Sequence, residues 1–202
     1  LYLMKFDLLT GVFTLVPLAW LDKRPGVTIG QILRNWGLVC LGNFGGAFTV
    51  AVMMAFVFTY GFNTDGGAIA QKVATIGESR TVGYASYGLD GWITVFIRGM
   101  LCNWMVSMGV VGAMISTSVS GKWLAMWMPI MLFFYMGFEH SIVNMFLFPF
   151  SLIMGGNFTI ADYLLWNELP VALGNLVGGL VFVGLMIYYT HVKTGSKRTL
   201  SK

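Results

Sequence analysis

The sequence predicts an all-α integral membrane protein built as an inverted repeat with broken helices. Hydrophobic residues make up 57% of the chain and charged residues only 10%, whereas about a quarter of the residues of a soluble domain are charged. The apolar residues form long blocks, and a helix needs about 20 residues to cross a hydrocarbon core about 30 Å thick. A β-barrel would show alternation in segments of about ten residues. The predicted spans are 3–20, 36–62, 92–117, 123–154 and 169–190.

Two stretches of the chain resemble each other. Residues 4–17, MKFDLLTGVFTLVP, align without gaps on residues 136–149, MGFEHSIVNMFLFP, at an offset of 132 positions. An odd number of spans in each repeat places the two repeats in opposite orientations, as in many channels and transporters. Further matches at this offset are Asn35 with Asn167, Gly42 with Gly174, Asn43 with Asn175 and Gly46 with Gly178.

The repeat also predicts how the chain is organised. Residue 1 aligns with residue 133, midway through the predicted span 123–154, and the second repeat has three spans. We therefore expect roughly forty or more residues ahead of residue 1, so that about four and a half of six spans are present here. The parts of this single transmembrane domain are a first-repeat remnant 1–62, an outer loop 63–91, a second repeat 92–191 and a tail 192–202.

Basic residues indicate the orientation in the membrane. The loop 21–35 and the tail are rich in lysine and arginine, whereas acidic residues outnumber basic ones in the loops 63–91 and 155–168. The positive-inside rule then places the C-terminus in the cytoplasm. The net charge of +4 follows from this orientation and requires no nucleic-acid partner. We expect a bacterial inner membrane, with an organelle envelope of bacterial descent as the alternative.

The polar stretch GFEHSIVNMF, residues 137–146, interrupts the fourth predicted span. That span is too long for one straight crossing, and Gly137 predicts a break in it. Irregular backbone at membrane depth is tolerated where it lines a cavity or is buried in protein. His140 is the only histidine within a predicted span, and an ionisable group there is a functional hypothesis. The alternative is a buried neutral histidine that bonds a neighbouring helix.

Other polar residues of the spans have two interpretations each. Asp7 and Glu139 match in the repeat, one residue ahead of each half-helix, which favours helix caps over ion ligands or proton carriers. Asn103 in mid-span contacts either the substrate or a neighbouring helix. Arg98, near the outer end of its span, is expected to reach toward the membrane interface.

Two G-N-x-x-G stretches predict close helix packing. Glycines four residues apart let two helix backbones approach each other. The residues assigned to this packing are Asn43, Asn175, Gly42, Gly46, Gly174 and Gly178.

Nothing in the chain predicts catalysis, a metal or a cofactor. Cys40 and Cys102 lie in separate spans without a CxxC partner, which is typical of small buried hydrophobes. The spans contain no second histidine for a bis-histidine haem and no nucleophile–base spacing. A membrane enzyme or haem protein is therefore the less favoured class, and an optical spectrum would identify the haem version.

Three motifs resemble the formate/nitrite transporter family. They are NWGLVCLGNFGGA at 35–47, RGMLCNWMV at 98–106 and GFEHSIVNMF at 137–146, and the resemblance runs essentially end to end. It implies a homopentamer of aquaporin-like six-helix monomers in the lipid bilayer, each with its own pore. The expected partners are protons and small monovalent anions such as formate and nitrite, with bicarbonate or another weak-acid anion as the alternative.

The resemblance also implies roles for particular residues. His140 corresponds to the central pore histidine, Phe133 to the outer hydrophobic constriction and Asn103 to the pore asparagine. The second constriction, and a mobile loop with a threonine that faces the histidine, are expected ahead of residue 1. The absence of an Asn-Pro-Ala pair at the breaks disfavours a neutral-solute channel of aquaporin type.

One position departs from the family pattern. The family usually has a lysine sixteen residues before the pore asparagine, where this chain has Tyr87. Arg80 or Lys72 would then supply the positive field of the outer vestibule. Because histidine titrates near physiological pH, we expect His140 to couple anion permeation to pH.

Overall fold

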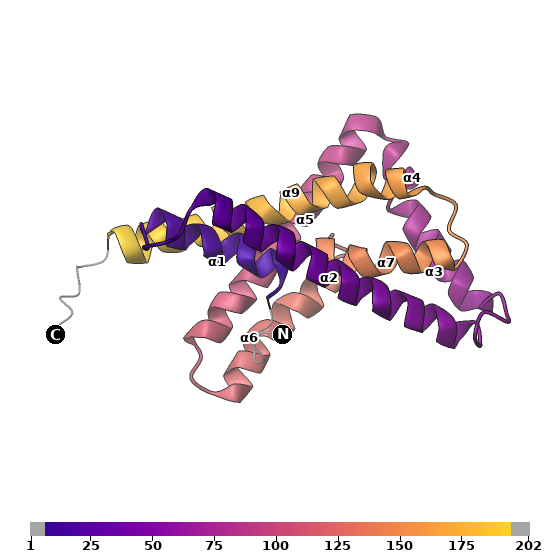
Figure 1. Ribbon diagram of the computed structural model, residues 1–202, viewed down its shortest axis with the longest axis horizontal. Helices are drawn as coiled ribbons and strands as arrows, with labels where there is room; N and C mark the ends of the chain where they lie inside the picture. Colours follow the sequence, from indigo (N-terminus) through magenta and orange to yellow (C-terminus); the bar gives the residue numbers. More distant parts are fainter. Residues whose placement is uncertain (1–6, 195–202) are drawn as a thin grey trace.

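The computed structural model describes residues 7–194, and its regular secondary structure over this range is helical (Figure 1). The prediction of an all-α chain with broken helices is confirmed. The α-helices are α1 (Leu9–Leu21), α2 (Ile29–Phe58), α3 (Gly67–Ser79), α4 (Val82–Ala85), α5 (Gly88–Ile115), α6 (Val119–Tyr135), α7 (Ser141–Ile153), α8 (Ile160–Tyr163) and α9 (Leu169–Gly179). The π-helical segments are η2 (Leu164–Glu168), η3 (Leu180–Leu185) and η4 (Tyr188–Lys193).

Three continuous helices of the described range are long and apolar enough to cross a membrane. They comprise α2, α5 and the run Ile160–Lys193, which joins α8 to η4. Two shorter apolar helices, α1 and α7, complete the apolar part. α5 packs along α9, and α2 packs along α7.

The helix break lies where the sequence predicts it. α6 ends at Tyr135 and α7 begins at Ser141, and Gly137 between them has a φ of 65°. A positive φ suits glycine because it has no Cβ. α1 and α7 both begin near the centre of the molecule and run toward opposite ends, as the inverted repeat requires (Figure 1).

Glycines of α9 allow close packing against α5. A Cβ on Gly174 would collide with the carbonyl oxygen of Phe96, and one on Gly178 with that of Met100. The matching glycines of the first repeat differ, since a Cβ on Gly42 or Gly46 meets no atom of the described chain within 4 Å.

The structure adds helical segments outside the predicted spans at two places. α2 begins at Ile29 instead of residue 36, because Thr28 and Gln31 form a reciprocal capping box at its start. The predicted outer loop 63–91 contains α3 and α4. α3 is amphipathic and packs its apolar side against α7, so this segment folds as a helix and not as an open loop.

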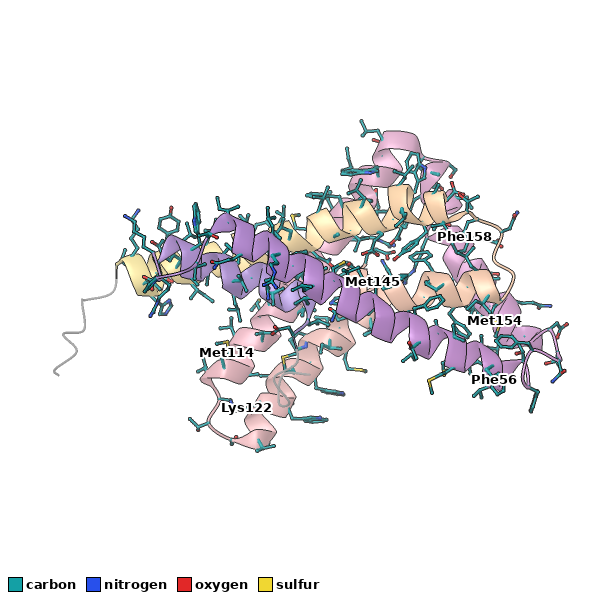
Figure 2. All side chains as sticks on the ribbon, viewed as in Figure 1. Phe56, Met114, Lys122, Met145, Met154 and Phe158 are labelled. Carbon is teal, nitrogen blue, oxygen red and sulfur yellow. The ribbon has the colours of Figure 1, made fainter. Side chains whose placement is uncertain are left out.

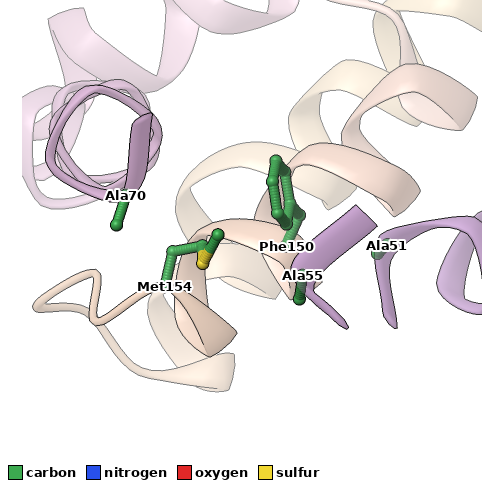
Figure 3. Packing of buried hydrophobic residues seen from close by; sticks show 5 residues of the cluster. All are labelled: Ala51, Ala55, Ala70, Phe150 and Met154. Atoms are coloured by element: carbon green, nitrogen blue, oxygen red, sulfur yellow. The ribbon is translucent and has the colours of Figure 1, made fainter. Parts of the chain in front are cut away.

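An apolar cluster holds α3 to two other helices. Ala51 and Ala55 of α2, Ala70 of α3, and Phe150 and Met154 of α7 are buried together (Figure 3). The three alanines let α2 and α3 approach the larger side chains of α7. The cluster therefore fixes the α2–α3 turn against the far end of α7.

The two turns that flank α2 lie at opposite ends of the molecule (Figure 1). The turn between α1 and α2 lies beside the C-terminal end of the described chain, opposite the α2–α3 turn (Figure 1). The Tyr188 hydroxyl donates to the Leu21 carbonyl at 3.1 Å. Lys122 lies near the tip of the α5–α6 hairpin (Figure 2) and donates to the Ala113 carbonyl. Most of the predicted tail, 195–202, is outside the described residues.

The tight α5–α9 contact predicts a selective effect of adding one methyl group. Gly178→Ala places a Cβ against the backbone of Met100, and such overpacking costs about 1–3 kcal/mol. Gly45→Ala in α2 is the matched control, since its Cβ meets nothing within 4 Å among the described residues. Thermal unfolding in detergent should show a lower midpoint for Gly178→Ala alone. Equal midpoints for both variants would contradict the packing.

Candidate functional site

His140 lies at the break, where it is the N-cap of α7. Its Nδ1 accepts a hydrogen bond from the Val143 backbone N–H at 3.3 Å, and its Nε2 is 3.2 Å from the Thr10 Oγ1. Because Nδ1 is the acceptor, the neutral ring carries its proton on Nε2, which faces the hydroxyl. The side chain is 5% exposed. The starts of the two half-helices thus meet through one histidine and one threonine.

Thr10 is a residue that sequence reasoning missed. The expectation that the threonine facing the histidine precedes residue 1 is wrong, because Thr10 is the second residue of α1 and is fully buried. One sequence feature pointed to Thr10. It lies three positions after Asp7, and Asp7 aligns in the repeat with Glu139, the residue before His140. Hydroxyls are common in membrane helices, where they also bond the helix backbone, so this signal is weak.

An asparagine caps the start of α7. The Asn175 Oδ1 accepts from the Ser141 N–H at 3.0 Å, and its Nδ2 donates to the Glu139 carbonyl at 3.1 Å. The same amide also donates to the Gly99 carbonyl at 2.7 Å. Asn175 therefore joins α9, α5 and the broken segment, which is more than helix packing.

The first repeat has the same arrangement 132 positions earlier. The Asn43 Oδ1 accepts from the Leu9 N–H at 3.0 Å, and its Nδ2 donates to the Asp7 carbonyl at 3.2 Å. The predicted capping role thus belongs to Asn43 and Asn175. The Asp7 side chain is exposed and makes no hydrogen bond within the described part of the chain. Its expected capping role is corrected.

The Glu139 carboxylate also has a different role from the predicted cap. It is fully buried and accepts from Arg80 Nη1 at 3.4 Å, Tyr84 Oη at 3.2 Å and Asn144 Nδ2 at 3.0 Å. Asn167 Nδ2 contributes a further contact at 3.4 Å. A buried carboxylate needs a countercharge and several donors. This network supplies both and ties the outer segment around α4 to the break.

The π-helical segment η2 turns two consecutive side chains into the protein. Asn167 accepts from Asn144 Nδ2 at 2.6 Å and donates to the Arg80 carbonyl at 2.9 Å. Its neighbour Glu168 accepts from the Ser141 hydroxyl and from Tyr163 at 2.9 Å. Single π-helical turns occur often at functional sites. Through these contacts, η2 binds Asn144 and Ser141, which both lie in the first turn of α7.

Asn103 is fully buried, and its Nδ2 donates to the Thr10 carbonyl at 3.1 Å and the Asn175 carbonyl at 2.6 Å. Both amide hydrogens are therefore engaged. The Oδ1 has no partner among the described residues, but an oxygen acceptor does not attract an anion. Of the two interpretations of Asn103, this geometry supports helix positioning.

Phe133 forms an apolar wall beside the histidine. Its ring lies 5.6 Å from the His140 ring at an interplanar angle of 15°, and 4.4 Å from the Phe134 ring. Phe133 is buried together with Cys102 and Val106. Such a wall keeps water away from the imidazole.

Hydroxyls continue on the other side of Thr10. Thr14, one turn further along α1, lies 2.7 Å from Ser107 of α5 between the two side-chain oxygens. Both residues are buried. The polar side chains on this side of the His140–Thr10 pair, Thr14 and Ser107, are neutral. The side chains around Glu139 include charged groups.

The two predicted vestibule cations lie in different surroundings. Lys72 is exposed on α3, while the charge of Arg80 is balanced by Glu139. Within residues 7–194, no three histidine, cysteine or acidic side chains lie close enough to hold a metal ion.

Comparisons with known proteins agree with the motifs. The family model described as Formate/nitrite transporter matches residues 1–189. A "Probable formate transporter" of Methanothermobacter thermautotrophicus is 36% identical over 197 residues, covering 93% of this chain and 69% of the relative. A formate channel of Bacillus thuringiensis is 30% identical over 190 residues, covering 94% and 68%.

Solved structures show the same fold. A pentameric formate channel with formate bound superposes with a TM-score of 0.71 at 26% identity, covering 93% of this chain and 76% of that one. An ion channel of the same family gives a TM-score of 0.69 at 28% identity, covering 91% and 68%.

Replacing Asn175 should loosen the start of α7. Asn175→Leu keeps the volume but leaves the Ser141 N–H without an acceptor, which costs about 1–3 kcal/mol. We expect faster hydrogen exchange in the peptide covering 139–147. Asn157→Leu in the exposed α7–α8 loop is the control and should leave that peptide unchanged. Unaltered exchange in Asn175→Leu would show that the cap is dispensable.

Proposed function

The chain belongs to the formate/nitrite transporter family, whose members are membrane channels and transporters and not enzymes, and we propose that it passes small monovalent anions of the formate and nitrite class. In this proposal, the anion meets His140 and Thr10 midway through a pore within each monomer. Weak-acid anions then cross in a pH-dependent manner.

One observation carries the proposal, namely the convergence of two half-helix N-termini on the His140–Thr10 pair. The N-terminal end of a helix carries a partial positive charge that favours anions. α1 and α7 approach this point from opposite repeats. Their dipoles therefore add at the place where the two polar side chains meet.

The hydrogen-bond donors there also suit an anion. The Nε2–H donates to the Thr10 oxygen, and the Thr10 hydroxyl hydrogen has no acceptor among residues 7–194, so it can donate to a passing anion. Next to the apolar wall of Phe133, an anion loses hydration at a cost of several kcal/mol. The Thr10 hydroxyl and the two helix dipoles offset part of this cost.

Protonation removes the remaining charge. A protonated His140 carries a hydrogen on both ring nitrogens, so its Nδ1 no longer accepts from the Val143 N–H. Transfer of the Nε2 proton to formate or nitrite then gives the neutral acid and a neutral imidazole whose hydrogen is on Nδ1. The neutral acid passes an apolar constriction more easily than the anion. Transport then depends on the protonation of one histidine, which acid pH favours.

The assembly follows from the relatives and the exposed surface. The solved formate channel is described as pentameric, and we propose a homopentamer for this chain. α2 buries only Ile32, Ala51 and Ala55 within the described structure and exposes most of its apolar side chains. Lipid and neighbouring subunits would cover such a surface. The basic residues near the α1–α2 turn support a cytoplasmic C-terminus.

His140→Asn should abolish the pH dependence of transport. The asparagine keeps a polar side chain but cannot take up a proton near neutral pH. We expect formate or nitrite uptake into proteoliposomes, measured at two pH values, to lose its rise at acid pH. Uptake should fall about tenfold or more, since each 1.4 kcal/mol of lost stabilisation is a factor of ten.

His191→Asn is the matched control, because His191 is exposed at the far end of η4 and should leave uptake unchanged. A His140→Asn channel with wild-type uptake and pH dependence would exclude the proposed role of the histidine.

Thr10→Val tests the hydroxyl separately. Valine matches the shape of threonine but leaves the Nε2–H without an acceptor, at a cost of about 1–3 kcal/mol. We expect formate uptake about tenfold below that of the wild type, with recovery in Thr10→Ser. Thr49→Val is the control, because Thr49 is exposed on α2 and bonds only its own helix. Equal uptake by Thr10→Val and Thr49→Val would rule out a role for the hydroxyl.

A further inference from the structure

Among the described residues, no carboxylate forms an ion pair with Arg98. The ion pairs among residues 7–194 are Arg24 with Asp22 and Arg80 with Glu139. Arg98 lies on α5 and is half-buried. A half-buried cation without an anionic partner is costly to maintain, so its surroundings indicate what it can bind.

Tyr84 holds this guanidinium in place. Arg98 Nη1 donates to the Tyr84 Oη at 2.6 Å, and the Arg98 Cζ lies 6.0 Å from the centre of the Tyr84 ring. Arg98 therefore contacts the segment around α4. Arginine has five N–H donors, and the other four make no hydrogen bond within the described range.

The two arginines near Tyr84 are not equivalent. The Tyr84 hydroxyl gives its hydrogen to Glu139 at 3.2 Å and accepts from Arg98. Arg80 contacts Glu139 directly, whereas Arg98 is connected to that carboxylate only through the Tyr84 hydroxyl. The surplus positive charge belongs to Arg98, and the predicted vestibule field of Arg80 is largely balanced.

This chain of bonds leads toward the histidine. Arg98 contacts Tyr84 of α4, Tyr84 contacts Glu139, and Glu139 directly precedes His140. α4 belongs to the segment that the positive-inside rule places outside. Arg98 thus lies on the outer approach to the break.

We infer that Arg98, positioned by Tyr84, is an anion-capture site on the outer side of the pathway. This inference rests on the proposed function and adds a residue for which the motifs gave no role in transport. The ligand class is a small planar anion with two oxygens, because a guanidinium binds such groups through two parallel hydrogen bonds. An arginine stays charged at all relevant pH values, so capture raises the local anion concentration without altering the pH profile.

The test is formate uptake into proteoliposomes with the full-length protein, over a range of formate concentrations. Arg98→Gln should raise the half-saturating formate concentration about tenfold, since local positive fields raise association rates by 10-fold or more. The maximal uptake and its pH dependence should stay at the wild-type level. Arg98→Lys keeps the charge but not the paired donors and should fall between the two.

Lys193→Gln removes an equal charge from the exposed segment η4 and is the matched control, with no expected shift. Tyr84→Phe removes the oxygen that holds Arg98 and should shift the half-saturating concentration in the same direction. Both Arg98 variants are first compared with the wild type in thermal midpoint and oligomeric size.

The inference is overturned if Arg98→Gln matches Lys193→Gln, or if folded Arg98→Gln loses uptake equally at all concentrations. The first result would fit an arginine that faces lipid headgroups, and the second a purely structural one. Absence of formate and nitrite uptake in the folded wild-type protein would instead reject the proposed function itself. The two failures are therefore distinguishable.

Discussion

The structure depends on satisfying backbone N–H groups where a helix begins inside the membrane. Water is absent there, so each free N–H needs a partner within the protein. Asn43 and Asn175 provide it, each accepting from the first turn of a half-helix and donating to the carbonyl two residues earlier. With the breaks held in this way, the N-termini of α1 and α7 can meet at the His140–Thr10 pair. The asparagines thus permit a polar centre without a water-filled interruption of the backbone.

Glu139 adds a second constraint beside that centre. A buried carboxylate next to His140 would favour a permanently protonated ring and would repel an anion. Its contacts with Arg80, Tyr84 and Asn144 spread and balance the negative charge, so the dipoles of the half-helices are not cancelled. The same contacts fix the outer segment around α4 at the position where Arg98 is held. One network of contacts therefore balances the charge of Glu139 near the centre and holds the surplus charge of Arg98 further out.

The sequence predicted the fold better than the contacts of the site. Hydropathy and the 132-residue offset are properties along the chain, and they sufficed to predict the all-α class and the break at Gly137. The partners of Asn43 and Asn175 lie 34 positions away, and a G-N-x-x-G stretch fits packing and capping equally well. Thr10 has only a weak sequence signal, its position three residues after Asp7. The surplus charge of Arg98 follows only from knowing that Glu139 is already paired with Arg80.

The repeated backbone carries side chains that differ between its halves. At the offset of 132, His140 corresponds to Leu8 and Thr10 to Ile142, so each half contributes one polar and one apolar residue to the centre. A symmetric pair of histidines would repel each other once both were charged, whereas a single histidine beside a hydroxyl can exchange one proton. Asn144, which binds Glu139, corresponds to Val12, so this amide contact with the carboxylate exists on one side only. The fold supplies symmetric dipoles, and these substitutions give the two sides of the pathway different chemistry.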